Sequence, residues 1–321
     1  MKMQPGTDIQ LAKTLLLQGE LVAIPTETVY GLAANAFNGN AVAKIYSIKN
    51  RPQFNPLIIH TDKLEKLAEW GINLPEQALV LAKQFSPGPL TYVVKKSAFI
   101  PDIVTAGHDS VAVRIPNHPL TLRLLEQLEF PLAAPSANPS GFISPTTAQH
   151  VFEQLGSKIP YILDGGPCIV GLESTIISFV SERPALLRLG GLTVEDIESV
   201  LGSSLDKSLL INNDNPLSPG MLSRHYSPAK KMVIGNVADY LDNYSTDKIA
   251  VIHFSEPDVF LPETNQFILS PNADLNEAAQ KLFAVMRQAD KLDVEIIIAD
   301  EFPGTGLGNA INDRLRRASV L

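Results

Sequence analysis

The sequence contains one cysteine, no long apolar run and no excess of positive charge, and each absence excludes a class of protein. Cys168 is alone, so an internal disulfide and a cysteine metal cluster are both excluded. We interpret its thiol as buried or inert, because no histidine follows it at a known nucleophile spacing. No apolar run approaches the length of a membrane span, and residues 1–10 lack the basic flank and apolar core of a signal peptide. We therefore expect a cytoplasmic protein.

The charge and the common motifs exclude further classes. A net charge of −8 at pH 7 argues against a protein that coats nucleic acid through bulk electrostatics, although local basic clusters can still hold a small anion. The sequence has no Walker loop, no HExxH and no GxSxG in a triad context. The run GTGLGN at residues 304–309 places Asn309 where the dinucleotide fingerprint requires its last glycine, which argues against nucleotide binding there.

What the sequence does contain is typical of a folded chain with two domains. Its 321 residues exceed one average domain, and 45% of them are hydrophobic. The pattern predicts a first domain over residues 1–205, a linker over 206–229 and a smaller domain over 230–321. Many strands with few long helices predict an α/β fold with a twisted, mixed, open sheet in the first domain. Strands that alternate with helices predict a Rossmann-like α/β unit in the last.

Apolar runs and helical spacing locate the expected elements of the first domain. A helix that Gly19 ends precedes a strand at Leu21–Ile24, and Asn40 is expected to cap the next helix. Further strands are expected at Leu57–His60, Tyr92–Val94, Val111–Ile115, Pro131–Ala134, Tyr161–Leu163, Ser174–Val180 and Ala185–Leu189.

Hydroxyls and cations gather at the ends of these strands, where an α/β sheet assembles ligand pockets. The arginines in loops are Arg51, Arg114, Arg188 and Arg224, and a guanidinium suits phosphate or carboxylate. Taken singly, several of these polar residues have a purely structural explanation. His60 is explained as a core histidine, and Arg114 and Arg188 are explained as ion-pair partners of surface carboxylates. Their convergence on strand ends favours a polyanionic ligand.

Eight motifs, in chain order, carry a resemblance to a known family. They are PTETVYGL, KNRPQFNPLIIH, SPGPLTYVV, VAVRIPNHP, AAPSANPSG, ILDGGP, ESTII and LLRLGG, between Ile9 and about Leu201. This part of the chain resembles the threonylcarbamoyl-AMP synthases built on the YrdC-like domain. The run SPGMLSRHYSP followed by an α/β domain is similar to the long form of that enzyme.

The resemblance implies a nucleotidyltransferase. Its members convert L-threonine, bicarbonate and ATP into L-threonylcarbamoyl-AMP and pyrophosphate, with Mg²⁺ on the ATP phosphates. This is the first step toward threonylcarbamoyl-adenosine at position 37 of tRNAs that read ANN codons. The product would pass to a tRNA-modifying transferase complex, and no membrane is involved.

The resemblance also implies the site residues. Lys49 and Arg51 would act in catalysis by offsetting the repulsion between two anionic reactants. The positions implied for threonine are Thr28, His60, Arg114, Ala134 and Ser174, and those for ATP are Arg51, Asn55, Ser110, Ser136, Ser144, Arg188 and Tyr226. Many relatives have threonine at the position of Ser110, where this chain keeps a hydroxyl.

Two other functions fit parts of the sequence, RNA binding and carbamoyl transfer. An RNA-binding module would use the same basic face, but the acidic charge, the aromatic content of 7% and the absence of an RNA-recognition motif argue against it. A carbamoyl transferase of hydrogenase maturation would need acylphosphatase-like and zinc-finger segments, which the chain lacks.

Overall fold

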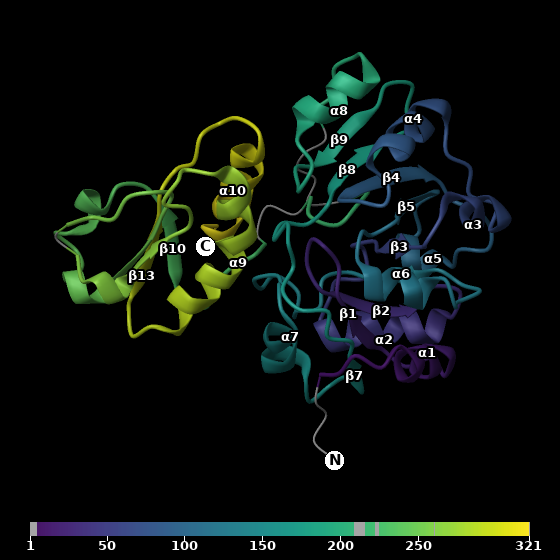
Figure 1. Cartoon of the computed structure of the whole chain (residues 1–321), viewed down its shortest axis with the longest axis horizontal. Helices are drawn as coiled ribbons and strands as arrows, with labels where there is room; N and C mark the ends of the chain where they lie inside the picture. The colour runs from purple at the N-terminus through teal and green to yellow at the C-terminus, as the bar shows by residue number, and fades with distance from the viewer. Residues whose placement is uncertain (1–4, 209–215, 222–224, 260, 321) are drawn as a thin grey trace.

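The computed structural model describes residues 5–208, 216–221, 225–259 and 261–320. Its elements form a nine-stranded mixed sheet followed by a four-stranded parallel sheet (Figure 1). The predicted fold, an open mixed α/β sheet followed by a smaller α/β unit, is confirmed. Arg224, one of the four arginines singled out in the sequence, lies outside the described residues.

The large sheet has the strand order β7-β1-β2-β6-β3-β5-β4-β8-β9 and is therefore open, with β7 and β9 at its edges. Its strands are β1 (Val22–Ile24), β2 (Gly31–Asn35), β3 (Ile58–His60), β4 (Leu90–Lys95), β5 (Ser110–Arg114), β6 (Leu132–Ala133), β7 (Tyr161–Ile162), β8 (Thr175–Ser178) and β9 (Ala185–Arg188). Gly6 and Asp206 pair with the two edges through single bridges. The helices of this unit are α1 (Ile9–Leu17), α2 (Gly39–Lys49), α3 (Leu64–Glu69), α4 (Glu76–Phe85), α5 (Asp102–Thr105), α6 (Pro119–Leu125), α7 (Ala148–Leu155) and α8 (Val194–Leu201).

The two faces of this sheet are covered differently. Alternate residues of a strand point to opposite faces, so Tyr92 and Val94 of β4 pack into the main core with α2, α4 and α8. On the other face, α1 and α6 cover only the part formed by β7, β1, β2 and β6. We call the rest of that face the open face; its apolar residues are Ile58, Val93, Ala112, Ile176 and Leu187. Met221 and Leu217 pack on it, from a segment that is not helical.

The smaller sheet has the order β10-β13-β11-β12, and all its strands are parallel. We call the elements from β10 to α10 the C-terminal unit. Its strands are β10 (Lys231–Ile234), β11 (Ile249–His253), β12 (Gln266–Ile268) and β13 (Ile296–Ala299). Its helices are α9 (Leu275–Lys291) and α10 (Leu307–Ala318), with short 3₁₀ turns η1 (Val237–Tyr240), η2 (Thr246–Lys248) and η3 (Glu263–Asn265).

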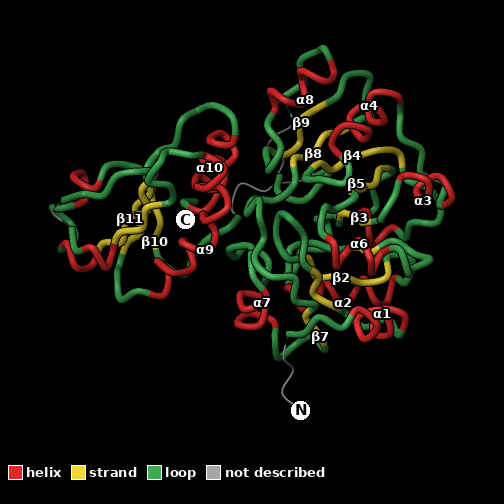
Figure 2. The backbone as a smooth tube through the Cα atoms, viewed as in Figure 1, coloured by secondary structure: helices red, strands yellow, loops and turns green. Residues whose placement is uncertain are grey.

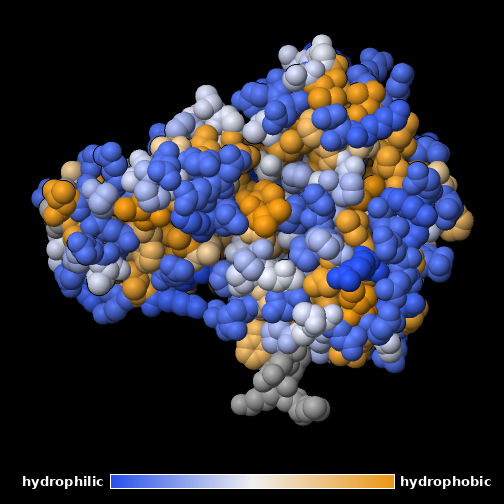
Figure 3. Space-filling view, in the orientation of Figure 1, coloured by the Kyte–Doolittle hydropathy of each residue, from blue (hydrophilic) through white to orange (hydrophobic). Residues whose placement is uncertain are grey.

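Helices α9 and α10 lie between the smaller sheet and the larger unit, as Figures 1 and 2 both show. They share a core with residues of the larger unit, among them Val29, Ile143 and Leu172. On the surface, hydrophilic residues dominate the visible face of the C-terminal unit, and an apolar cluster marks the place where the two lobes meet (Figure 3). The two units are thus joined through side chains as well as through the linker.

Three local predictions were wrong or incomplete. The helix α2 is capped by Asn38, whose side chain accepts from the amides of Asn40 and Ala41, so Asn40 lies inside the first turn. The strand β2 was not predicted, because its alanines and its first residue, Gly31, carry little β propensity; pairing with β1 and β6 determines it instead. The short helix α5 was also not predicted.

Among the described residues, no helix is long and apolar enough to cross a membrane.

The packing of α1 generates a stability prediction. Leu16 is fully buried, whereas its neighbour Leu17 is 60% exposed on the same helix. Leu16→Ala should lower the free energy of unfolding by about 2–5 kcal/mol, because it leaves a cavity in a close-packed core. Leu17→Ala should change it by no more than about 0.5 kcal/mol. Denaturant titration of both variants checks this, and equal losses would contradict the described orientation of α1.

Candidate active site

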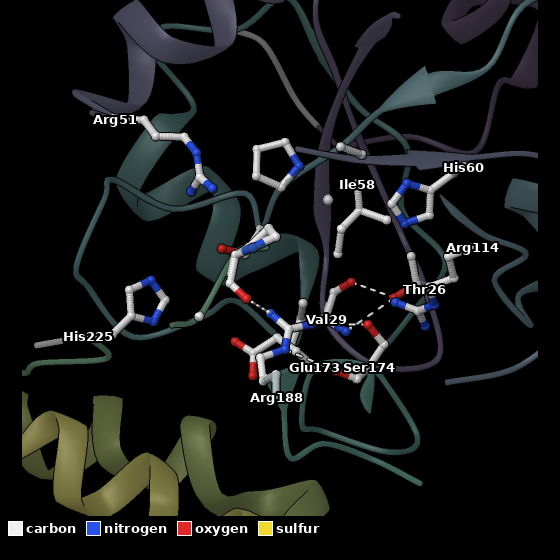
Figure 4. A pocket seen from close by; sticks show the side chains of 16 residues that line it. Thr26, Val29, Arg51, Ile58, His60, Arg114, Glu173, Ser174, Arg188 and His225 are labelled. Carbon is white, nitrogen blue, oxygen red and sulfur yellow. Dashed lines mark hydrogen bonds between the residues drawn. The ribbon is translucent and has the colours of Figure 1, made fainter. Parts of the chain in front are cut away.

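One pocket collects the ends of several strands of the large sheet on its open face. Its volume is about 50 Å³ when only the space that a water molecule can occupy is counted. The residues that line it are Thr26, Val29, Gly31, Arg51, Ile58, His60, Arg114, Ala134, Pro135, Ser136, Glu173, Ser174, Arg188, Pro219, Gly220 and His225. Figure 4 shows Arg51 and His225 on one side, His60 and Arg114 on the other, and Arg188 with Glu173 and Ser174 between them.

Strand pairing places His60 beside Arg114. The strands β3 and β5 are parallel, and His60 and Arg114 are partners in their register. Burial, reinforced by the positive charge of Arg114, lowers the pKa of His60 to about 3, so the ring is neutral at pH 7. A neutral imidazole can accept or donate a hydrogen bond without adding charge to the pocket.

Arg114 has a donor group, Nη2, from which no described residue accepts a hydrogen bond. Its Nε donates to the carbonyl of Gly88 at 3.2 Å, and its Nη2 lies 2.8 Å from Oε1 of Glu27. That contact is an ion pair but not a hydrogen bond. Neither Nη2 of Arg114 nor either oxygen of Glu27 has a hydrogen-bond partner among the described residues. Unsatisfied buried polar groups such as these are typical of a ligand site.

Arg51 follows α2, which Asn50 ends in the left-handed conformation. The guanidinium donates from Nε to the carbonyl of Asn55 at 3.0 Å, and from Nη2 to Asn55 Oδ1 at 2.6 Å and to the carbonyl of Pro56 at 2.7 Å. Burial lowers the pKa of Arg51 to about 10, so it stays charged at pH 7. Asn55 does not line the pocket; it orients Arg51.

Lys49 lies behind the pocket rather than on its wall. Its buried ammonium donates to the carbonyl of Ser136 at 2.6 Å and to the carbonyl of Asn138. Burial, and then the charge of Arg51, hold the pKa of Lys49 well below its usual range. In this structure Lys49 therefore supports the loop that carries Ser136, and its predicted catalytic role stays a prediction.

Arg188 is held by Ser174. Its Nε donates to the carbonyl of Ser174 and its Nη2 to the Ser174 hydroxyl, both at 3.0 Å, and the same hydroxyl lies 2.7 Å from that of Thr91. Burial lowers the pKa of Arg188 to about 10. Arg51 and Arg188 are close enough that the charge of Arg188 lowers the pKa of Arg51, so an anion between them would relieve their repulsion.

Glu173 is a lining residue that was not singled out in the sequence. It accepts a hydrogen bond from the Ser144 hydroxyl at 2.6 Å and one from Nε of Arg314, on α10, at 2.9 Å. Burial alone would raise the pKa of Glu173, but the charges of Arg314 and Arg188 outweigh it and lower the pKa to about 2. No sequence signal connects Glu173 with Arg314, which lies 141 residues away in the chain.

The other predicted residues lie near the pocket or apart from it. Thr28 is buried behind the lining, with its hydroxyl 2.8 Å from that of Thr26. Tyr226 is also behind it, although the adjacent His225 lines the pocket. Ser110 is at the other end of β5 from Arg114, roughly 13 Å along the strand. It lines a separate groove with Phe179 and Leu217.

The described side chains of the site offer no set of ligands for a metal ion. Among the residues that the structure describes, no group of three His, Cys, Asp or Glu side chains could hold one. Glu173, which lines the pocket, and Glu27, which lies behind the lining on Arg114, are each paired with an arginine. These residues do not form a resident metal site.

Two families match the chain. The Sua5, YciO and YrdC family, described as "Telomere recombination", matches residues 14–190. The family described as "Threonylcarbamoyl-AMP synthase, C-terminal domain" matches residues 192–320. Together they match nearly all of the chain.

Individual relatives and a solved structure agree with these families. A threonylcarbamoyl-AMP synthase of Pyrococcus abyssi is 41% identical over 97% of this chain and 94% of its own length. One of Bacillus subtilis is 42% identical over 97% and 92%. The crystal structure of P. abyssi Sua5 complexed with L-threonine superposes with a TM-score of 0.89, at 40% identity, over 97% of this chain and 94% of that chain. This chain belongs to the threonylcarbamoyl-AMP synthase family.

Proposed function

We propose that this protein makes L-threonylcarbamoyl-AMP from L-threonine, bicarbonate and ATP and releases pyrophosphate. The observation that carries the proposal is the convergence of three buried guanidiniums, those of Arg51, Arg114 and Arg188, with the neutral His60 in one pocket. Such a site suits two anionic reactants that would otherwise repel one another. The relatives support this interpretation and do not support the RNA-binding alternative.

The geometry suggests how the pocket is divided. Arg114 and His60, next to Ala134 and Ser174, would hold threonine, with the guanidinium on its carboxylate and Thr28 supporting the loop. Arg51 and Arg188, with Ser136, would hold the phosphates. Asn55, Ser144 and Tyr226 would act on the ATP side by orienting their neighbours. Ser110 would reach ATP only if the nucleotide extends along the open face toward the groove that Ser110 lines.

The chain's residues position reactants and stabilise charge, and no covalent enzyme intermediate is required. The threonine amine forms a carbamate with bicarbonate or CO₂, and a carbamate oxygen attacks the α-phosphorus while pyrophosphate leaves. Arg51 and Arg188 would stabilise the negative charge that builds on the phosphoryl oxygens. Holding the reactants in line can supply about 7 to 11 kcal/mol of the barrier reduction. An Mg²⁺ ion would arrive on the ATP phosphates, since the protein carboxylates are already paired.

We also propose that the linker over residues 206–229 separates a catalytic domain from the C-terminal domain and acts as a lid. Pro219 and Gly220 line the pocket, and Met221 is fully buried on the open face. A lid in this position would keep water away from the labile adenylate. The product would pass to a tRNA-modifying complex, and we expect both steps in the cytoplasm.

The first prediction from this proposal concerns turnover. Pyrophosphate release from ATP and bicarbonate should depend on L-threonine, and Arg51→Ala should reduce it on the order of 100-fold or more, because a buried phosphate donor is lost. Arg183→Ala, on an exposed loop, is the control and should leave the rate unchanged. Absence of threonine-dependent release from folded wild-type protein would refute the proposed function.

A second prediction concerns threonine. Arg114→Ala combined with Glu27→Gln, which avoids an unpaired buried carboxylate, should raise KM for threonine about 10- to 100-fold and change KM for ATP much less. Steady-state kinetics with each substrate varied in turn provides the measurement. An unchanged KM for threonine would remove Arg114 from the threonine site.

A third prediction concerns the lid. Gly220 has φ +90°, and a Cβ there would come within 2.5 Å of Cδ of Arg188, whose guanidinium is pinned by Ser174. Gly220→Ala should therefore lower kcat/KM for ATP by about tenfold, since one strong hydrogen bond is worth that much. Gly202→Ala is the matched control: φ is +67° and nothing lies within 4 Å, so it has the backbone strain without the collision. Equal kinetics in the two variants would show that the lid does not contact Arg188 in the working enzyme.

A further inference from the structure

Arg314 belongs to the C-terminal unit, but its side chain is fully buried against the larger unit. Its Nε donates to Glu173 at 2.9 Å, and its Nη2 donates to the carbonyl of Leu189 at 2.7 Å. Its Nη1 donates to the neighbouring Asp313 at 2.6 Å. All three donor groups of this guanidinium are thus used, and two of them are used across the junction between the units.

The carboxylate that Arg314 holds connects it to the active site. Glu173 lines the pocket, and its other oxygen accepts from the Ser144 hydroxyl at 2.6 Å. A second arginine of the C-terminal unit, Arg287 on α9, donates to the carbonyls of Ile143 and Ser144. Arg287 of α9 therefore holds the backbone of residues 143–144, and Glu173 holds the side chain of Ser144.

The same arginine also contacts the linker. The guanidinium of Arg314 lies 5.0 Å from the ring centroid of Tyr226, and on α9 Phe283 stacks with that ring at 5.4 Å. Tyr226 is fully buried and adjacent to His225, which lines the pocket. Figure 4 shows helices in the colours of the C-terminal unit beside His225.

We propose that Arg314 is a positioning residue of the active site, which acts through Glu173 to orient Ser144 and to leave Arg188 available for the phosphates. The inference rests on the proposed function and extends it, because it makes the C-terminal unit a part of the catalytic architecture. The physical reason is competition: a buried carboxylate needs a cation, and among the described residues Arg188 is the other arginine whose charge acts on Glu173. While Arg314 neutralises Glu173, Arg188 stays on Ser174.

The kinetic test compares Arg314→Met with wild type in the full-length chain. We expect KM for ATP to rise on the order of 10- to 100-fold in Arg314→Met, since a charged hydrogen-bonded pair is broken, and KM for threonine to change much less. Arg314→Lys keeps the charge and should recover most of the loss. Arg316→Ala, on the same helix but 62% exposed at its side chain, is the control and should match wild type.

Whether Arg314 acts through Glu173 is tested by the double variant. In an enzyme that carries Glu173→Gln, no buried carboxylate competes for Arg188, so adding Arg314→Met should cost little further activity. If the activity losses of the two single variants multiply in the double variant, the proposal is overturned. It is also overturned if Arg314→Met has wild-type KM for ATP. Should Arg314→Met fail to fold on its own, the double variant carries the test, because it leaves no unpaired buried carboxylate: its KM for ATP should match that of Glu173→Gln, and a tenfold or larger rise above Glu173→Gln would refute the proposal.

A pH series adds a measurement that a merely structural role would not change. Among the described residues, the groups facing Glu173 are Arg314, Arg188, Ser144 and the neutral His225. Arg314 is the largest charge that lowers the pKa of Glu173, so its loss raises that pKa, and Glu173 becomes neutral at a higher pH than in wild type. A neutral Glu173 does not compete for Arg188, so the increase in KM for ATP caused by Arg314→Met should shrink as pH is lowered from 8 to 5. Glu173→Gln and Arg314→Lys should show no such change relative to wild type. A ratio of KM values, Arg314→Met to wild type, that is independent of pH would contradict the proposal.

The thermal stability of the protein tests the pairing of Glu173 with Arg314 without any measurement of turnover. With its folded-state pKa lowered to about 2, Glu173 stabilises wild type above the pKa of an unfolded glutamate, about 4.3, and this contribution is lost as pH falls through 2. Arg314→Met lacks the largest charge that lowers the folded-state pKa of Glu173, so this pKa rises, and the gap in Tm from wild type should widen as pH is raised from 3 to 7.5. In the Glu173→Gln background the gap should stay constant. If wild type releases no pyrophosphate, the proposed function fails, whereas a gap in Tm that is independent of pH refutes the pairing itself.

Discussion

Positive charge buried in one pocket is the condition on which the rest of the site depends. Arg51, Arg114 and Arg188 are each less than one-tenth exposed, and burial lowers the pKa values of Arg51 and Arg188 to about 10 without neutralising them. Taking a charge out of water is costly unless fixed dipoles or counter-ions replace the water. Backbone carbonyls of Asn55, Gly88 and Ser174 provide those dipoles, and an anionic ligand completes the compensation.

The sheet makes this arrangement possible because it is covered unevenly. Helices pack on one face, whereas on the other they cover only the part formed by β7, β1, β2 and β6, which leaves the open face for the pocket and for residues 216–221. Residues that are far apart in the chain meet there because their strands are neighbours. His60 and Arg114 are 54 positions apart in sequence and are register partners. Rigid strands with polar ends hold such residues more precisely than loops could.

Two buried carboxylates, Glu173 on the pocket wall and Glu27 behind it, explain why the two units depend on one another. Glu27 is paired within the larger unit by Arg114, whereas Glu173 is paired by Arg314 from α10. A unit that supplies the counter-ion of an active-site carboxylate contributes to the chemistry without touching a substrate. This gives the C-terminal unit a role that its own fold does not reveal, since a parallel four-stranded sheet is compatible with many functions.

The sequence alone determined most of the elements, the fold class and the family, because apolar periodicity, turn residues and ordered motifs are local properties of the chain. The strand β2 and the short helix α5 were exceptions. It also indicated which hydroxyls and cations stand at strand ends. Only the tertiary structure decided which of them face the pocket: Arg51, His60 and Arg188 do, whereas Lys49 turns to backbone carbonyls and Ser110 lies at the far end of its strand. The link from Arg314 to Glu173 was invisible in the sequence, because a contact between distant residues depends on how two packed units meet, and no local pattern encodes that.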